Sequence, residues 1–184
     1  QHAASKVENG LDRIGYFEEL ISVATLSYNH PNWTYPQIDD RFSCSAVAMG
    51  HPLLPANKRV DNSYEVILNP TVDIVTGSNM AGKSTFIKTI GIVIYLTHIG
   101  IGAPAAKVTL SLFDGLITNL TIADNVVKGE SYFFNEVQRI KNTVEKIKDG
   151  KKYFVLIECI ACKLYIGAIF NLKFEFIMPS LTLA

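Results

Sequence analysis

Neither sign of charge predominates in this chain, and this absence limits the partners that it can hold by itself. Lysine plus arginine number 17, as do aspartate plus glutamate, so the formal net charge is zero. A chain without a basic excess has no general positive field to attract nucleic acid. Any contact with DNA therefore belongs to a local patch or to parts of a larger protein outside these residues.

Cysteine is also scarce, which argues against a secreted, disulfide-held scaffold. The three cysteines are an odd number without a disulfide framework, so we expect a reducing, cytoplasmic environment. Cys159 and Cys162 have the C-x-x-C spacing of metal and redox sites. A zinc site would need a second ligand pair, and a redox site would need a thioredoxin-like setting. Both are missing, and structural thiols are the preferred interpretation.

A long uninterrupted apolar run is missing as well. The best membrane candidate, residues 154–170, contains Glu158 and Lys163 near its middle and is shorter than the roughly 20 residues of a membrane-spanning helix. We therefore predict no membrane contact, and read this stretch as a core strand followed by an apolar segment. The length of 184 residues and the composition, 48% hydrophobic and 18% charged, suit one domain with a sizeable core, with or without an appendage. Because the chain starts at Gln1, without Met or an apolar signal segment, we expect a piece of a longer protein.

What the chain does contain is a glycine motif with a specific chemistry. Residues 77–84 read G-x-x-x-x-G-K-S, and Thr85 follows. Gly77 and Gly82 allow a tight turn whose successive N–H groups point inward and form an anion nest. Lys83 adds a positive charge toward the β- and γ-phosphates, and the Ser84 hydroxyl is a ligand for Mg²⁺. The helix that begins here adds the positive end of its dipole.

The flanking residues support this interpretation. Residues 72–75 are short, apolar and β-branched, as expected of a buried parallel strand. Residues 86–99 are apolar on nearly all sides, which predicts a helix buried against a sheet, and Gly100 and Gly102 end it. The alternative, a glycine-rich turn without a ligand, explains Lys83 poorly. The sequence therefore predicts that a nucleotide binds here.

The rest of the chain alternates helices and strands. Residues 7–27 carry apolar side chains at helical spacing, and Pro31 and Pro36 bracket a polar connector. Strands are predicted at residues 41–49, 64–68, 107–110, 115–119 and 153–157. A second amphipathic helix is predicted at residues 131–149, with one apolar face formed by Phe134, Val137, Ile140, Val144 and Ile147.

The glycine motif and four other segments together resemble the MutS family of DNA mismatch-repair ATPases. Residues 76–85 read TGSNMAGKST, which is similar to the family's phosphate loop. The further similarities are the His-Pro element at 50–54, the turn at 99–105, the signature loop at 129–136, and the end of a lever helix at 7–36. The resemblance covers roughly residues 8–158. Around residues 131–133 the sequence looks closer to divergent MutS-like proteins than to the mismatch-repair enzymes proper.

This resemblance implies an α/β P-loop NTPase of the ABC type that binds ATP or ADP with Mg²⁺ and works as a dimer. Residues 1–36 would be the end of the helical lever with its connector, residues 37–158 the ATPase domain, and residues 159–184 an atypical apolar tail. Ser131 would be offered in trans to the partner's nucleotide. Adenine contacts would fall near Arg59, Val60 and Asn62, with Arg59 in place of the family's usual aromatic residue. Phosphates and metal would be held by Gly77, Ser78, Asn79, Met80, Ala81, Gly82, Lys83, Ser84 and Thr85.

The chain departs from the family at the carboxylates that support hydrolysis. The family ends the next core strand with Asp-Glu, whereas this chain reads Glu158-Cys159. Glu158 can serve on the Mg²⁺ side, with Ser84 as the other metal ligand. Cys159 cannot replace the second carboxylate, because a neutral thiol is a poor acceptor and a poor base for water. Beyond Cys159 the resemblance stops, which leaves two hypotheses: a segment that is not native family sequence, such as a reading-frame error produces, or a divergent tail that packs as strands.

Two functional hypotheses follow from the resemblance. The first is an ATPase whose nucleotide-driven homodimer closure is coupled through the lever helix to a DNA clamp in domains outside this chain. The second is a module that binds ATP and dimerises without turnover, which Cys159 favours. A P-loop kinase is disfavoured, because it has no use for the signature-like loop around Ser131.

Overall fold

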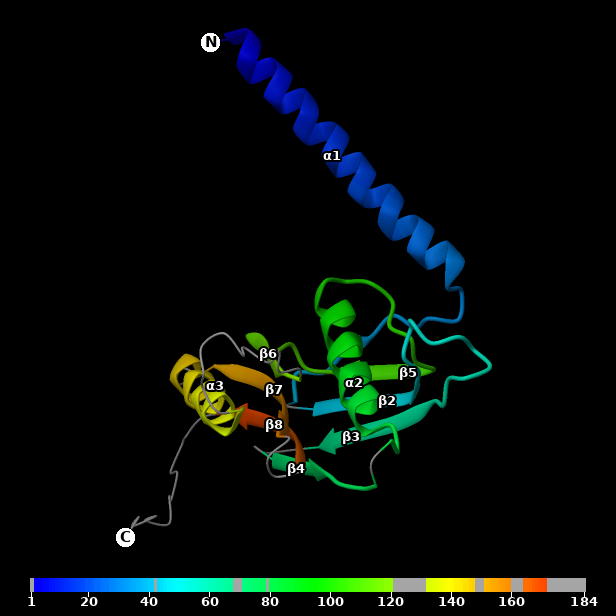
Figure 1. The fold of residues 1–184 in the computed structure, drawn as a ribbon. Coiled ribbons are helices and arrows are strands. Elements are labelled where there is room, and N and C mark those ends of the chain that lie inside the picture. The colour runs from blue at the N-terminus through cyan, green and yellow to red at the C-terminus, as the bar shows by residue number, and fades with distance from the viewer. Residues whose placement is uncertain are drawn as a thin grey trace.

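The computed structural model describes residues 2–41, 43–67, 71–78, 80–120, 132–147, 151–159 and 164–171. It is a mixed α/β body from which one long helix projects (Figure 1). In the described part, the body contains two sheets of four strands each. The element order along the chain agrees with the alternation of helices and strands that the sequence predicts.

The projecting helix, α1 (His2–Asn29), covers the predicted segment 7–27 and extends further at both ends. At about 1.5 Å per residue it is roughly 42 Å long. Its apolar side chains Val7, Leu11, Ile14 and Phe17 are all exposed. The helix ends where His30 donates its backbone N–H to Leu26, directly before Pro31.

The first sheet has the order β1-β5-β2-β3. It consists of β1 (Gln37–Ile38), β5 (Lys107–Leu110), β2 (Ser43–Met49) and β3 (Asn62–Ile67). β2 pairs antiparallel with both β3 and β5, whereas β1 pairs parallel with β5. The strands predicted at 41–49, 64–68 and 107–110 are therefore confirmed to within two residues.

The second sheet has the order β4-β8-β7-β6. It consists of β4 (Thr71–Val75), β8 (Leu164–Asn171), β7 (Lys152–Cys159) and β6 (Gly115–Asn119). β6 and β7 pair in parallel, and β8 runs antiparallel to both β7 and β4. The predicted strands at 115–119 and 153–157 are confirmed, and Phe154, Val155 and Leu156 of β7 are fully buried.

The expectation that residues 72–75 form a buried parallel strand is wrong. β4 pairs antiparallel with β8, and Val72 and Ile74 are 58% and 56% exposed. β8 runs antiparallel to β7, since the link of residues 160–163 between them is too short for a parallel crossover, which needs a dozen or more residues. β4 runs in the same direction as β7, and because β8 lies between the two, β4 has an antiparallel neighbour. Residues 164–171, within the segment expected to be an atypical tail, thus form a strand of the sheet, as the divergent-tail hypothesis predicts.

Helix α2 (Lys83–His98) forms the centre of the body, next to both sheets (Figure 1). Ile87, Ile90, Val93 and Ile94 are buried, as the all-round apolar sequence predicts. The chain leaves the helix through Gly100, whose φ of 78° is the left-handed conformation that glycine tolerates best. The predicted buried helix is therefore confirmed.

Helix α3 (Tyr132–Lys146) confirms the second predicted helix, but its apolar face is not the buried one. Val137, Ile140 and Val144 are exposed, whereas Thr143 is buried. Thr143 accepts a 2.7 Å hydrogen bond from the Asn119 side chain at the end of β6. Of the helices that the structure describes, none has both the length and the apolar character needed to cross a membrane.

Candidate functional site

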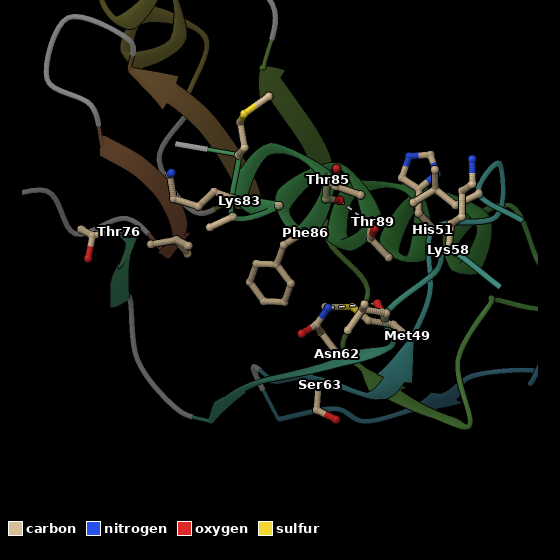
Figure 2. A pocket seen from close by; sticks show the side chains of 16 residues that line it. Met49, His51, Lys58, Asn62, Ser63, Thr76, Lys83, Thr85, Phe86 and Thr89 are labelled. Carbon is tan, nitrogen blue, oxygen red and sulfur yellow. Dashed lines mark hydrogen bonds between the residues drawn. The ribbon is translucent and has the colours of Figure 1, made fainter. Parts of the chain in front are cut away.

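A hollow of about 600 Å³ opens at the N-terminus of α2 and is here called the loop hollow (Figure 2). Its wall combines the loop before α2, the first turns of α2, the segment 51–60 and the adjoining ends of β2 and β3. In Figure 2, Thr76 and Lys83 lie at one end, and Met49, Asn62 and Ser63 lie at the other. Of the residues predicted as nucleotide ligands, seven line the loop hollow: Val60, Asn62, Met80, Ala81, Gly82, Lys83 and Thr85.

The loop before α2 has the backbone that its glycines predict. Gly77 has φ 150° and Gly82 has φ 86°, values at which a residue with a Cβ is strained. Met80 also adopts a positive φ, 66°, and its side chain is fully exposed in the loop hollow. Non-glycine residues in this region are uncommon and occur preferentially at functional sites. The loop is thus shaped by its backbone rather than by side-chain packing.

Lys83 lies across this loop. Its Nζ donates to the carbonyl oxygens of Gly77, at 2.8 Å, and Ser78, at 2.6 Å. The N-cap of α2 is Gly82, which has no side chain to cap the first turn. The first turn of a helix presents N–H groups and the positive end of the helix dipole, which together favour an anion. The end of α2 and the Lys83 ammonium therefore provide positive electrostatic potential at one place.

Ser84 and Glu158 meet although they are far apart in the sequence. The Ser84 hydroxyl donates a 3.0 Å hydrogen bond to Glu158 Oε1, and both residues are half-buried. Glu158 lies near the end of β7, and Ser84 lies in the first turn of α2. A hydroxyl and a carboxylate are oxygen ligands of the kind that Mg²⁺ accepts, and Mg²⁺ usually takes one or two carboxylates and fills its other positions with water and phosphate. The pair thus fits the predicted magnesium site.

Tyr64 and Asp73 form a contact that the sequence reasoning missed. The Tyr64 hydroxyl on β3 donates a 2.8 Å hydrogen bond to Asp73 Oδ2 on β4. Burial, with help from this bond, raises the pKa of Tyr64 well above its usual range. The bond joins the two sheets directly before the glycine loop. The signal that could have found it is Asp73 itself, an acidic residue inside an otherwise apolar strand.

The predicted adenine residues do not all face the same way. Val60 and Asn62 line the loop hollow, and Asn62 also donates a 3.1 Å hydrogen bond to the Val60 carbonyl. Arg59 does not line it, because its guanidinium pairs with Asp61 at 2.7 Å instead. Phe86 and His51, which were not predicted as ligands, do line it. His51 accepts a 3.3 Å bond from the Leu53 N–H, in keeping with a role in the turn.

For three residues of the predicted chemistry, the structure describes no side chain. Asn79 and Ser131 lie outside the described residues. Cys159 is described only through its backbone, which pairs with Leu164 as the last residue of β7. Within the described residues, no group of three or more histidine, cysteine, aspartate or glutamate side chains could hold a metal.

Comparison with known proteins finds one group of relatives, the DNA mismatch repair proteins. Residues 73–161 match the family model of MutS domain V. The DNA mismatch repair protein MutS of Ehrlichia chaffeensis is 30% identical over 156 residues, which is 84% of this chain and 19% of that protein. MSH3, the DNA mismatch repair protein of Candida albicans, is 29% identical over 76% of this chain and 14% of its own length. The Persephonella marina MutS protein is 29% identical over 84% of this chain and 18% of its own length.

The chain therefore spans less than a fifth of the length of these relatives. The region that matches the family model contains the glycine loop, α2, β7 and the Ser84–Glu158 contact. These matches extend well beyond the glycine motif. By the matched domain and by similarity along most of its length, the chain belongs to the MutS family of mismatch repair proteins.

Proposed function

We propose that the chain is an ATP-binding domain with the P-loop fold of ABC-type ATPases, and that it binds ATP with Mg²⁺ in the loop hollow. The observation that carries the proposal is the 3.0 Å contact between the Ser84 hydroxyl and Glu158. A cation-binding pair at the end of a glycine loop is what binding a magnesium nucleotide requires. Membership of the MutS family supports the same conclusion.

The residues present divide the work of binding between them. Lys83 exchanges the Gly77 and Ser78 carbonyls for phosphate oxygens, so that its charge is neutralised by the ligand rather than by its own loop. The first turn of α2 donates N–H groups to the same phosphates. Ser84 and Glu158 would hold Mg²⁺, which would supply positive charge to neutralise the phosphates. Val60, Asn62 and Phe86 also line the hollow and would contact the base.

Hydrolysis and coupling belong to the same proposal but depend on residues outside the described part. Ser131 of a second copy would close over the γ-phosphate, so the working form would be a homodimer. Closure would be transmitted through α1, which projects from the body, to DNA-binding domains of a longer mismatch-repair protein (Figure 1). The relatives named as mismatch repair proteins support this role.

A second candidate function, ATP binding without turnover, is favoured by one specific observation. Glu158 is followed by Cys159, where a carboxylate would orient the attacking water. A thiol is a poor hydrogen-bond acceptor and a poor base for water. The domain would then close on ATP and reopen by nucleotide release.

Calorimetric titration with magnesium and a non-hydrolysable ATP analogue tests the binding step. Removing the ammonium in Lys83→Ala should weaken binding by at least about tenfold, because a charge-assisted contact to phosphate is lost. Lys88→Ala is the matched control, because Lys88 is an exposed lysine on the same helix outside the loop hollow, and it should bind as the unaltered chain does. A folded chain that takes up no nucleotide would contradict the proposal.

Phosphate release separates the two candidates. If the domain is a switch, the unaltered chain binds ATP but turns over negligibly, and Cys159→Glu restores measurable release. If the domain is an ordinary ATPase, the unaltered chain hydrolyses ATP without this change, and the interpretation of position 159 is wrong.

A further inference from the structure

The segment 59–62 forms a wall between two hollows, and its side chains alternate between them. Val60 and Asn62 line the loop hollow. Arg59 and Asp61 line a second hollow of about 380 Å³ at the base of α1, here called the helix-base hollow. Alternation of this kind is a property of extended chain, in which successive side chains point to opposite sides. A shift of this segment therefore changes both hollows together.

Arg59 and Asp61 make a close ion pair on the helix-base side of this wall. Arg59 Nε lies 2.7 Å from Asp61 Oδ1, and Nη2 lies 3.4 Å from Oδ2. The two side chains are only 32% and 40% exposed. They lie directly over Gly50, where a Cβ would collide with the Arg59 Nε and Cδ atoms and with Asp61 Oδ1. Glycine at position 50 thus leaves the room that the ion pair occupies.

A short series of hydrogen bonds continues from Gly50 to the base of α1. The Gly50 N–H donates to the Pro104 carbonyl at 2.9 Å. Next to Pro104, Ala103 exchanges two backbone bonds with Thr34, at 2.9 and 3.0 Å. Thr34 follows Trp33, whose ring stacks on His30 with 4.2 Å between ring centroids, and both rings line the helix-base hollow. The ion pair, Gly50 and the connector after α1 therefore form one contiguous unit.

We propose that Arg59 and Asp61 are positioning residues for the base end of the nucleotide site. The pair holds the wall so that Val60 and Asn62 face the base, and it transmits nucleotide uptake to Trp33 at the base of α1. This inference rests on the proposed function, because it needs a nucleotide in the loop hollow. It assigns Arg59 a role behind the wall rather than stacking on the base.

Two variants disturb the pair by different means. Gly50→Ala displaces it sterically without changing any charge, and only the ends of flexible side chains need to move. Asp61→Asn removes the charge of the acceptor. The chain offers a matched control for each variant. Gly10→Ala is the control for Gly50→Ala, because a Cβ at position 10 on α1 meets nothing within 4 Å. Asp39→Asn is the control for Asp61→Asn, because Asp39 pairs with Arg41, two residues away in the sequence as in the Arg59–Asp61 pair, and Asp39 and Arg41 line neither hollow.

Each variant of the 184-residue chain is titrated with a magnesium-bound, non-hydrolysable ATP analogue and, separately, with inorganic tripolyphosphate. Gly50→Ala and Asp61→Asn should weaken the analogue roughly twofold to fivefold, the effect expected of a half-exposed ion pair. Binding of tripolyphosphate should not change, since it makes no use of the base wall. Both controls should bind both ligands as the unaltered chain does.

Trp33 supplies an independent signal, because it is the sole tryptophan of the chain. Its emission should shift when the analogue binds to the unaltered chain and to both controls, and the shift should be lost or reduced in the two pair variants. Tripolyphosphate should leave the emission unchanged. The signal reports on the connector after α1 and not on the loop hollow, which Trp33 does not line.

The possible failures are distinguishable. If the unaltered chain binds neither ligand, the proposed function itself is wrong. If it binds both, but Gly50→Ala and Asp61→Asn match their controls, the ion pair does not position the wall. If both ligands weaken together, the pair is merely structural, and the inference is overturned. Binding without any change in Trp33 emission in the unaltered chain overturns the link to α1.

Discussion

At the scale of single residues, the site is held by groups that already have partners before any ligand arrives. Lys83 donates to two carbonyl oxygens of its own loop, and Ser84 donates to Glu158. A ligand gains only the difference between these bonds and the new ones, because exchanged hydrogen bonds largely cancel in free energy. For the proposed nucleotide, affinity would therefore depend on the charge of its phosphates and on the shape of the loop, which Gly77 and Gly82 maintain.

The bond between Tyr64 and Asp73 leads to a prediction about stability. Tyr64→Phe removes a 2.8 Å bond to a half-buried carboxylate, and it should lower the free energy of unfolding by about 1–2 kcal/mol. Tyr35→Phe is the matched control, since the Tyr35 hydroxyl makes an exposed 3.3 Å contact with Ser27. Urea denaturation of both variants measures the difference. Equal midpoints would mean that the tie between β3 and β4 contributes nothing to stability.

At the scale of elements, the start of β7 depends on one carboxylate next to β6. Asp114 accepts a 2.8 Å bond from the Lys152 N–H and a 2.9 Å bond from Lys151 Nζ. These bonds, that of the Lys152 N–H first, hold the pKa of Asp114 below its ordinary value of 3.8. The carboxylate thus helps to keep the parallel pairing of β6 and β7, which begins at Gly115 and Tyr153.

A pH dependence follows from the direction of this shift. Because the pKa of Asp114 is lower in the folded chain than in the unfolded chain, its stabilising effect is present above pH 3.8 and disappears as the pH falls through the folded value. Asp114→Asn should lower stability near neutral pH and flatten the acid side of the stability curve below about pH 4. Thermal unfolding between pH 2.5 and 7 tests this, and an unchanged acid side would exclude Asp114 as a cause.

β8 is the element on which the second sheet depends. It lies between β4 and β7 and pairs with both, so that Ala168 is opposite Val72 on one side and Val155 on the other. Ala168→Pro should destabilise the chain by about 3 kcal/mol or more, because proline removes an N–H donor from a central strand. Circular dichroism and urea denaturation would reveal the loss. An unaltered midpoint would contradict the central position of β8.

At the scale of the whole molecule, local pattern predicted most of the elements, although not β1, whereas their mutual arrangement needed three dimensions. The periodicity of residues 86–99 and the glycines after them were enough to predict α2. The direction of β4 was mispredicted because it depends on β8, whose sequence carries no recognisable motif. The burial of Thr143 on α3 was not predicted, because its partner Asn119 lies at the end of β6 and periodicity cannot reveal such a pair.

The same contrast applies to the site. A spacing motif brought Lys83 and Ser84 together, because all its residues are neighbours along the chain. The resemblance to MutS proteins named Glu158 as the companion of Ser84, and the structure places the two in contact. The turn of Arg59 toward Asp61 could not be predicted from the sequence. Side chains alternate along the segment 59–62, and the sequence does not say which set faces the loop hollow. For the Tyr64–Asp73 bond, Asp73 stands out as the acidic residue of an apolar strand, but its partner on the other sheet has no local signature.

The position of β8 also determines when the second sheet can be completed during synthesis of the chain. β4 and β7 are not neighbours in the sheet, because β8 lies between them, and β8 ends only at Asn171. A ribosome that has released β4, α2 and β7 has therefore still not released the strand that joins them. Nascent chains that pause before this point would expose two unpaired strand edges, which are open to aggregation and to capture by chaperones.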